Sequence, residues 1–155
     1  ARSYAASIGR PLIASDVDCI ARGQVAAEDS VMEQLQNAPN GQYARNFIVL
    51  DTDLVSTTVY ADHYYDATPS WVTNEARARR ADLYLLCAPD LPWTSDGIRD
   101  LPNARAAIHQ RFVARLREFD ALTLHVQGQG GLRFDVALAA VRAWRAARAR
   151  RAAAR

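Results

Sequence analysis

The sequence predicts an α/β domain with a mostly parallel sheet, because short apolar runs alternate along the chain with longer segments of helical periodicity. Three runs have the length and composition of strands, and they occupy residues 46–50, 83–87 and 122–126. Each is apolar almost throughout, which is typical of strands that helices cover on both faces. The chain has 155 residues, enough for one domain of this class.

Five helices are expected around these strands. The first begins at a Ser-Asp-Val-Asp sequence at 15–18, which has the pattern of a capping box, and ends at the Asn-Ala-Pro-Asn-Gly turn at 37–41. Apolar residues recur at helical spacing in the others. These helices span 54–65, 71–80, 104–119, and the segment after the glycine-rich turn at 128–131. Thr68 and Pro69 suit the N-cap and first positions of the helix at 71–80.

The basic side chains are all arginines: the chain has 19 of them and no lysine. These residues therefore contain no lysine for a Schiff base or for binding phosphate in a P-loop. Six arginines and no acidic residue lie in 142–155, whereas the rest of the chain has 13 arginines and 17 acidic residues. We expect a folded domain over 1–141 and an Arg/Ala-rich helical tail over 142–155. Such a tail binds an anionic partner by counterion release, or is only a solvated helix end.

The sequence gives no sign of a membrane or secreted protein. No apolar run approaches the ~18 residues that a membrane-spanning helix needs, and no secretory signal precedes the domain. The two cysteines, Cys19 and Cys87, lie far apart and outside any CxxC motif, so we expect no structural zinc site. The expected location is the cytoplasm, with no membrane partner.

Two acidic residues follow the first predicted strand. Asp51 and Asp53 are two positions apart on an extended segment, so both carboxylates point to one side and can face a Mg²⁺ ion or a substrate hydroxyl. An apolar strand that ends in an acid is also typical of the Walker B segment in phosphoryl-transfer sites. Acidic residues end strands and begin helices in many other proteins, so the pattern leaves both interpretations open.

The long loop at 88–103 follows the second predicted strand and combines a planar ring with a cation. Trp93 and Arg99 lie on either side of a turn at Asp96. A ring for stacking and a guanidinium for phosphate suit a nucleotide site. The same residues also suit a packed surface loop, in which Trp93 is the hydrophobic plug and Arg99 pairs with a neighbouring aspartate. Their chemistry alone favours neither interpretation.

Several blocks of the sequence together resemble one known family. They are FIVLDTD at 47–53 with two threonines at 57–58, DLYLL at 82–86, and PW followed by DGIR within 92–99. These blocks resemble the ribosylnicotinamide kinase domain of NadR-type bacterial NAD-biosynthesis proteins and the AAA-type ATPase domains grouped with it. The segments at 1–4 and 20–28, and Arg133, also fit, so the resemblance covers nearly the whole chain. The PWxxDGIR block is its most specific part.

The resemblance implies the three-layer parallel sheet of a P-loop nucleoside kinase. It also implies ATP- and Mg²⁺-dependent phosphorylation of the 5′-hydroxyl of nicotinamide riboside, so that the partners are a small nucleoside and ATP. The implied roles are catalysis and metal binding for Asp51 and Asp53, catalysis for Arg99, substrate binding for Arg2, Tyr4, Trp93 and Asp96, and ATP binding for Arg133.

The sequence departs from this family at its start. The family begins with a strand and a GxxxxGK[ST] phosphate-binding loop, and no such segment occurs in these 155 residues. The glycines at 128–131 do not replace it, because no Lys-Ser/Thr pair follows them. We therefore expect a fold that is incomplete at the N-terminus, and no kinase activity without an upstream P-loop. The alternative is a non-catalytic, nucleotide-binding regulatory module of the same fold.

Overall fold

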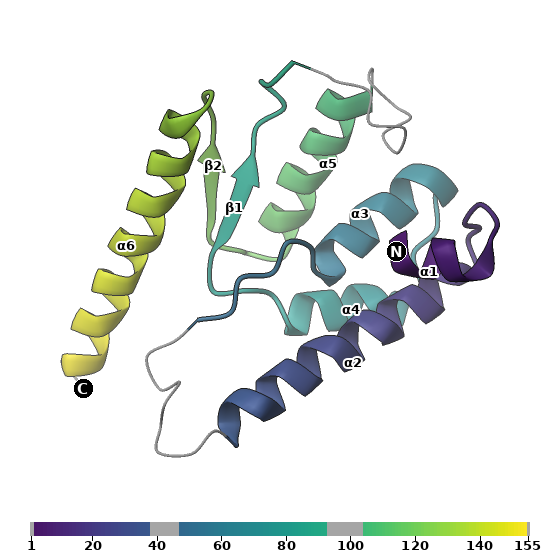
Figure 1. Cartoon of the computed structure of the whole chain (residues 1–155), viewed down its shortest axis with the longest axis horizontal. Helices are drawn as coiled ribbons and strands as arrows, with labels where there is room; N and C mark the ends of the chain where they lie inside the picture. The colour runs from purple at the N-terminus through teal and green to yellow at the C-terminus, as the bar shows by residue number, and fades with distance from the viewer. Residues whose placement is uncertain (1, 38–46, 93–103, 155) are drawn as a thin grey trace. The chain divides into compact units, whose positions relative to one another are not determined.

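The computed structural model describes residues 2–37, 47–92 and 104–154, which form six helices and two strands (Figure 1). The chain divides into two compact units, Ala1–Arg80 and Ala81–Arg155. The elements of the first unit are α1 (Arg2–Ile8), α2 (Asp16–Gln36), α3 (Leu54–Tyr65) and α4 (Ser70–Ala78). Those of the second are β1 (Tyr84–Cys87), α5 (Arg105–Glu118), β2 (Thr123–Val126) and α6 (Gly131–Ala153).

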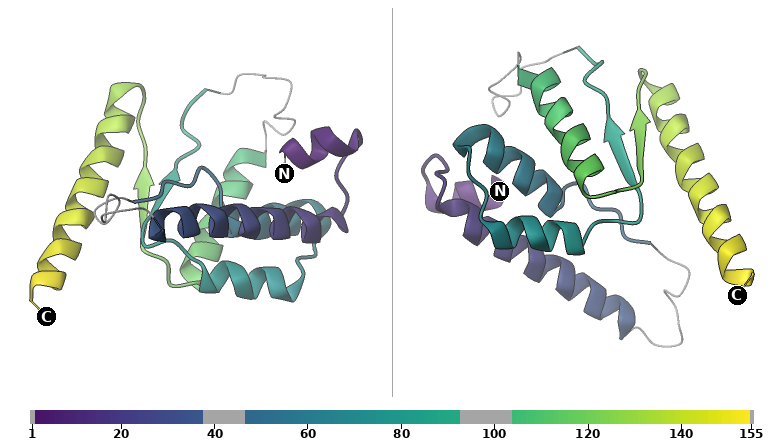
Figure 2. Two further views of the ribbon diagram at one scale, coloured as in Figure 1. Left: turned by 60° about the horizontal axis from the view of Figure 1, so that its bottom comes forward. Right: turned by 180° about the vertical axis from the view of Figure 1, so that it is seen from behind.

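The regular elements in the described part of the first unit are all helices, and α3 is the central one. This helix packs against both α2 and α4 (Figures 1 and 2). Its buried side chains follow the spacing of one helix face, and the neighbouring helices each bury a pair four residues apart. Besides Asp16 at the start of α2, the buried residues are Val17 and Ala21 of α2, Leu54, Val55, Thr58, Val59 and Ala61 of α3, and Val72 and Ala76 of α4.

The second unit is a small βαβ arrangement extended by a long helix. β1 and β2 pair in parallel, in a register that places Tyr84 opposite Thr123 and Cys87 opposite Val126. α5 makes the crossover between them, and the two strands lie between α5 and α6 (Figure 1). Leu116, Phe119 and Val126 are the buried apolar residues of this unit's described part.

The predicted helices are confirmed, but two of the residues predicted to cap them at the N-terminus do not do so. α3 has the predicted bounds, and α2 begins at the expected position. The predicted capping box is wrong, because Ser15 makes no side-chain hydrogen bond to the helix end. Thr68 is not the N-cap of α4 either: Pro69 has that position, and the Thr68 hydroxyl donates to Asp62 and to the carbonyl of Thr58. The sequence analysis did not predict α1.

The prediction of a third strand is wrong for the residues that the structure describes. The segment 47–50 has no strand geometry, and its side chains are exposed, Val49 to 79%. An apolar run becomes a strand only when another strand completes its backbone hydrogen bonds. β1 also alternates between exposed and partly buried residues, with Leu85 and Cys87 exposed, so one of its faces is not covered. The α/β class holds, but the described residues provide two parallel strands and not the predicted three-layer sheet.

The Arg/Ala-rich segment continues the last helix. α6 runs without a break from Gly131 to Ala153, and no residue of it is buried. The division between a domain at 1–141 and a tail at 142–155 stays a prediction. Across the described ranges, no helix combines the length and the apolar character that crossing a membrane requires.

Candidate functional site

The acidic turn, residues 51–53, joins the exposed segment 47–50 to α3. Asp53 is the N-cap of that helix: its backbone is extended, and its carboxylate accepts a hydrogen bond from the Ser56 amide at 3.2 Å. A carboxylate at this position satisfies one of the free amides of the first turn and interacts favourably with the helix dipole. The half-buried Asp53 side chain is therefore fixed by the same local structure that begins α3.

Asp51 differs from Asp53 because its carboxylate is exposed and has no polar partner in the described part of the chain. Such a carboxylate is accessible to a cation or to a substrate hydroxyl. Mg²⁺ is commonly held by one or two protein carboxylates together with phosphate oxygens and water. The two carboxylates of the acidic turn are donors of that kind, although no group of three or more candidate metal ligands gathers anywhere among the described residues.

The acidic turn is connected to α2 through Gln24. The Gln24 amide nitrogen donates to the carbonyl of Thr52 at 3.1 Å, and its amide oxygen accepts a hydrogen bond from the Thr57 hydroxyl at 3.1 Å. Burial, with a further contribution from the charge of Asp53, raises the pKa of Glu28, which lies one turn beyond Gln24 on α2. Gln24 was not among the predicted site residues.

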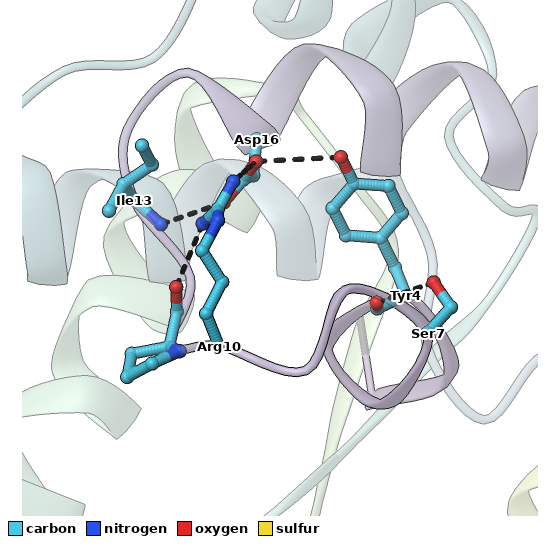
Figure 3. Close-up of polar contacts among 6 residues, drawn as sticks. Tyr4, Ser7, Arg10, Ile13 and Asp16 are labelled. Atoms are coloured by element: carbon cyan, nitrogen blue, oxygen red, sulfur yellow. Dashed lines mark hydrogen bonds and ion pairs between the residues drawn. The ribbon is translucent and has the colours of Figure 1, made fainter.

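A second polar cluster surrounds Asp16, at the start of α2. The buried Asp16 carboxylate accepts hydrogen bonds from both terminal nitrogens of Arg10, at 2.7 and 2.8 Å, and from the Ile13 amide at 2.9 Å. The Tyr4 hydroxyl donates to the same carboxylate at 3.4 Å (Figure 3). The Arg10 guanidinium and the Ile13 amide lower the pKa of Asp16 to about 2. This cluster fastens the loop between α1 and α2.

The predicted substrate-binding residues Arg2 and Tyr4 both lie on α1. The Tyr4 hydroxyl contacts Asp16 in this structure, whereas the Arg2 side chain lies outside the described residues. Their contact with substrate stays a prediction. The ion pair between Arg10 and Asp16 was not predicted, because Asp16 also fits the pattern of a helix cap. No periodic pattern reveals a pair that spans an irregular loop.

A third polar cluster lies at the carboxyl ends of the two strands in the second unit. Asp90, just after β1, accepts hydrogen bonds from the Gly128 amide at 2.6 Å and from Arg133 at 2.5 Å. Arg133 also donates to the carbonyls of Ala88 at 2.8 Å and Gly128 at 3.1 Å. The Gly128 amide, followed by the Arg133 guanidinium, lowers the pKa of Asp90. The φ of Gly128 is 99°, a conformation that favours glycine.

Arg133 therefore holds the ends of β1 and β2 together. Its side chain is only 17% exposed, and its two terminal nitrogens contact a carboxylate and two carbonyls of the protein. The predicted contact of Arg133 with ATP stays a prediction. Trp93, Asp96 and Arg99 lie outside the described residues, so their roles in catalysis and substrate binding also stay predictions.

A shallow hollow of about 340 Å³ lies between α2 and α4, and none of the predicted site residues lines it. The Cζ atom of Arg22 lies over the Trp71 ring, 4.6 Å from the ring centroid. The Trp71 indole nitrogen donates a hydrogen bond to the Asp18 carboxylate at 2.7 Å. The carboxylates of Asp29 and Glu75 both pair with Arg79. The polar groups of this hollow are thus paired with protein groups, which favours a packing role.

The Asp16 cluster predicts a loss of stability in acid. Because the fold lowers the pKa of Asp16 from 3.8 to about 2, its contribution is present above about pH 4 and disappears as the pH falls towards 2. Asp16→Asn should lower Tm by several degrees near neutral pH, and the difference from wild type should shrink in acid. Thermal unfolding followed by circular dichroism at several pH values measures this. Asp120→Asn is the control, because Asp120 is exposed and its left-handed φ of 51° suits asparagine. An equal effect at every pH would contradict the ion pair as the cause.

The Arg133 cluster predicts that lysine cannot replace arginine at this position. Arg133→Lys keeps the charge but removes the guanidinium group that binds Asp90 and two carbonyls. The free energy of unfolding should therefore fall by about 1–3 kcal/mol. Urea unfolding measures this. Arg111→Lys, at an exposed position on α5, should change little. Equal stability of the two variants would contradict the prediction that this position needs the guanidinium group.

Comparison with known proteins assigns the chain to a family. The family described as "AAA domain" has a model that matches residues 6–133. The trifunctional NAD biosynthesis/regulator protein NadR of Salmonella typhimurium is 29% identical over 115 residues, which are 73% of this chain and 26% of that protein. The chain thus spans about a quarter of the length of this relative, and no solved structure matches it. The resemblance to an AAA-type, P-loop kinase-like family is confirmed at this level. Because the family model matches most of its residues, the chain belongs to the AAA domain family.

Proposed function

We propose that this protein phosphorylates the 5′-hydroxyl of nicotinamide riboside, with ATP and Mg²⁺. The observation that carries the proposal is the acidic turn, where the accessible carboxylate of Asp51 lies beside the fixed carboxylate of Asp53. The likeness to a NAD biosynthesis/regulator protein supports the choice of substrate. The proposal includes the three-layer sheet of a P-loop nucleoside kinase. It requires a phosphate-binding loop beyond these 155 residues, since no GxxxxGK[ST] segment occurs within them.

The acidic turn has two tasks in the proposed reaction. Asp51 and Asp53 hold Mg²⁺ and orient the 5′-hydroxyl for attack in line with the terminal phosphate of ATP. Bound Mg²⁺ supplies the positive charge that neutralises the transferred phosphoryl group. Because the cap of α3 fixes Asp53, that carboxylate needs little reorganisation to act. The other proposed contacts are Arg99 with phosphate, Arg2, Tyr4, Trp93 and Asp96 with the nucleoside, and Arg133 with the adenine of ATP.

A second candidate function is a nucleotide-binding regulatory module without kinase activity. The observation that favours it is the complete absence of lysine from these 155 residues, because P-loop kinases use a lysine to bind the phosphates. Such a module would bind nucleotide through the same fold and would leave ribosides unchanged.

Substitution of the acidic turn tests the kinase proposal. Asparagine is as good an N-cap as aspartate, so Asp53→Asn removes the charge and keeps the helix start, as Asp51→Asn does at an exposed position. Each should lower kcat for nicotinamide riboside by about 100-fold or more, at nearly unchanged Tm. Asp66→Asn is the matched control: Asp66 is at the other end of α3, with a left-handed φ of 50° that asparagine tolerates.

The assay measures ATP-dependent phosphorylation of nicotinamide riboside, with uridine and guanosine as comparison substrates. It is run on the 155-residue chain and on a form extended upstream to a P-loop. Turnover in the extended form alone, lost in the two acidic-turn variants, is the expected result. If neither form phosphorylates the riboside while the longer one binds nucleotide, the kinase proposal is wrong and the regulatory module replaces it.

A further inference from the structure

We propose that Gln24 is a positioning residue for the acidic turn, which it holds against α2 so that the carboxylates of Asp51 and Asp53 keep their orientation. The consequence for catalysis rests on the proposed function. The positioning itself does not, because it follows from contacts within the first unit alone.

The contacts of Gln24 lie on both sides of the Asp53 cap. Its amide nitrogen donates to the carbonyl of Thr52, the residue between the two aspartates, at 3.1 Å. Its amide oxygen accepts from the hydroxyl of Thr57, in the first turn of α3, at 3.1 Å. The Thr57 amide in turn donates to the carbonyl of Asp53 at 3.2 Å. One side chain thus connects the peptide before the cap with the helix turn after it.

Gln24 is placed on a rigid part of α2. Ala21, one turn earlier, is fully buried, and Val17, one turn earlier again, is 4% exposed. These two side chains belong to the packed core of the first unit, where α3 packs against α2. A side chain that extends from such a position has a fixed origin, so its hydrogen bonds restrain the turn and not the helix that carries it.

The side-chain amide of Gln24 is the group that suits position 24. Glutamine presents a donor and an acceptor on one planar group, and both are required here: a donor for the Thr52 carbonyl and an acceptor for the Thr57 hydroxyl. A carboxylate at position 24 has no proton to donate to a carbonyl. It would also add a negative charge beside Glu28, which already receives a hydrogen bond from the Gln24 amide nitrogen at 3.3 Å.

The two aspartates depend on Gln24 to different degrees. Asp53 has an anchor of its own, because its carboxylate accepts the Ser56 amide. Asp51 has no polar partner among the residues that the structure describes, so the neighbouring peptide at Thr52 is its nearest restraint. A misplacement of about 1 Å in a reacting group costs about 100-fold in rate. Loss of the Gln24 contacts should therefore act mainly through Asp51.

The test uses three variants of glutamines on α2. Gln24→Leu removes all three hydrogen bonds of the Gln24 side chain at similar volume, whereas Gln24→Glu removes only the two that the amide nitrogen donates. Gln34→Leu is the matched control, because the exposed Gln34 amide donates to the Ser30 hydroxyl, one turn earlier, at 3.4 Å and to no other group of the described residues. Hydrogen exchange of the backbone amides at 52–57 is measured on the 155-residue chain. The values of kcat and KM for riboside phosphorylation are measured on the form extended to a P-loop, and Tm is measured on both.

Both Gln24 variants should exchange the amides at 52–57 faster than wild type. Each should lower kcat by about 10- to 100-fold with little change in KM, since the restraint acts on the reacting groups and not on binding. Gln34→Leu should match wild type in each measurement. Wild-type exchange in Gln24→Leu, or a lower Tm with unchanged kcat, overturns the proposal. If the wild-type protein itself shows no turnover, the proposed function fails, and the exchange rates still decide whether Gln24 holds the turn.

Discussion

The N-cap of α3 is the interaction on which the candidate site depends. Leu54 and Val55 are buried within two residues of Asp53, so the core of the first unit fixes where α3 must begin. The helix needs an acceptor at the preceding residue, and the carboxylate of Asp53 provides it. The position of the acidic turn therefore follows from burial of α3, before any ligand binds. A site built in this way is preorganised, because folding and not binding orders its backbone.

The carboxylates of the described residues differ in how fully the protein satisfies them, and at the candidate site a fixed carboxylate lies beside an accessible one. The buried Asp16 accepts from two nitrogens of Arg10, from an amide and from a hydroxyl, and Asp90 accepts from an amide and a guanidinium. Both have lowered pKa values because the fold supplies donors to the charged form. Asp51 has no such donor in the described ranges. Satisfied carboxylates hold loops in place, whereas an accessible one is free to bind a cation.

Local sequence patterns predicted most helices and two of the three expected strands. The features that were not predicted depend on contacts between residues far apart in the sequence. The bounds of α3 and the positions of β1 and β2 follow from spacing and composition within single segments. The run 46–50 has equally strong strand composition, but whether it pairs depends on residues elsewhere in the chain. The acidic turn was visible because its aspartates are neighbours. The contacts of Gln24 join residues 28 and 33 positions apart, and no helical or strand periodicity links such positions. The two aspartates of the acidic turn are thus apparent from the sequence, whereas the contacts that support the turn are not.

The arginines of the described residues limit where phosphate can be bound. The guanidinium group of arginine forms two parallel hydrogen bonds with a carboxylate or a phosphate. A guanidinium that is paired with a carboxylate is therefore not free to bind phosphate. Arg10 pairs with Asp16, Arg22 with Asp18, and Arg133 with Asp90. These guanidinium groups hold loops, helix turns and strand ends in place within each unit.

A phosphoryl-transfer site needs cations that are not already paired, and these 155 residues contain no lysine to provide one. The acidic turn can therefore supply the metal and hydroxyl side of the proposed reaction. The phosphate side must come from groups outside these ion pairs, which is why the proposal requires both Arg99 and a phosphate-binding loop.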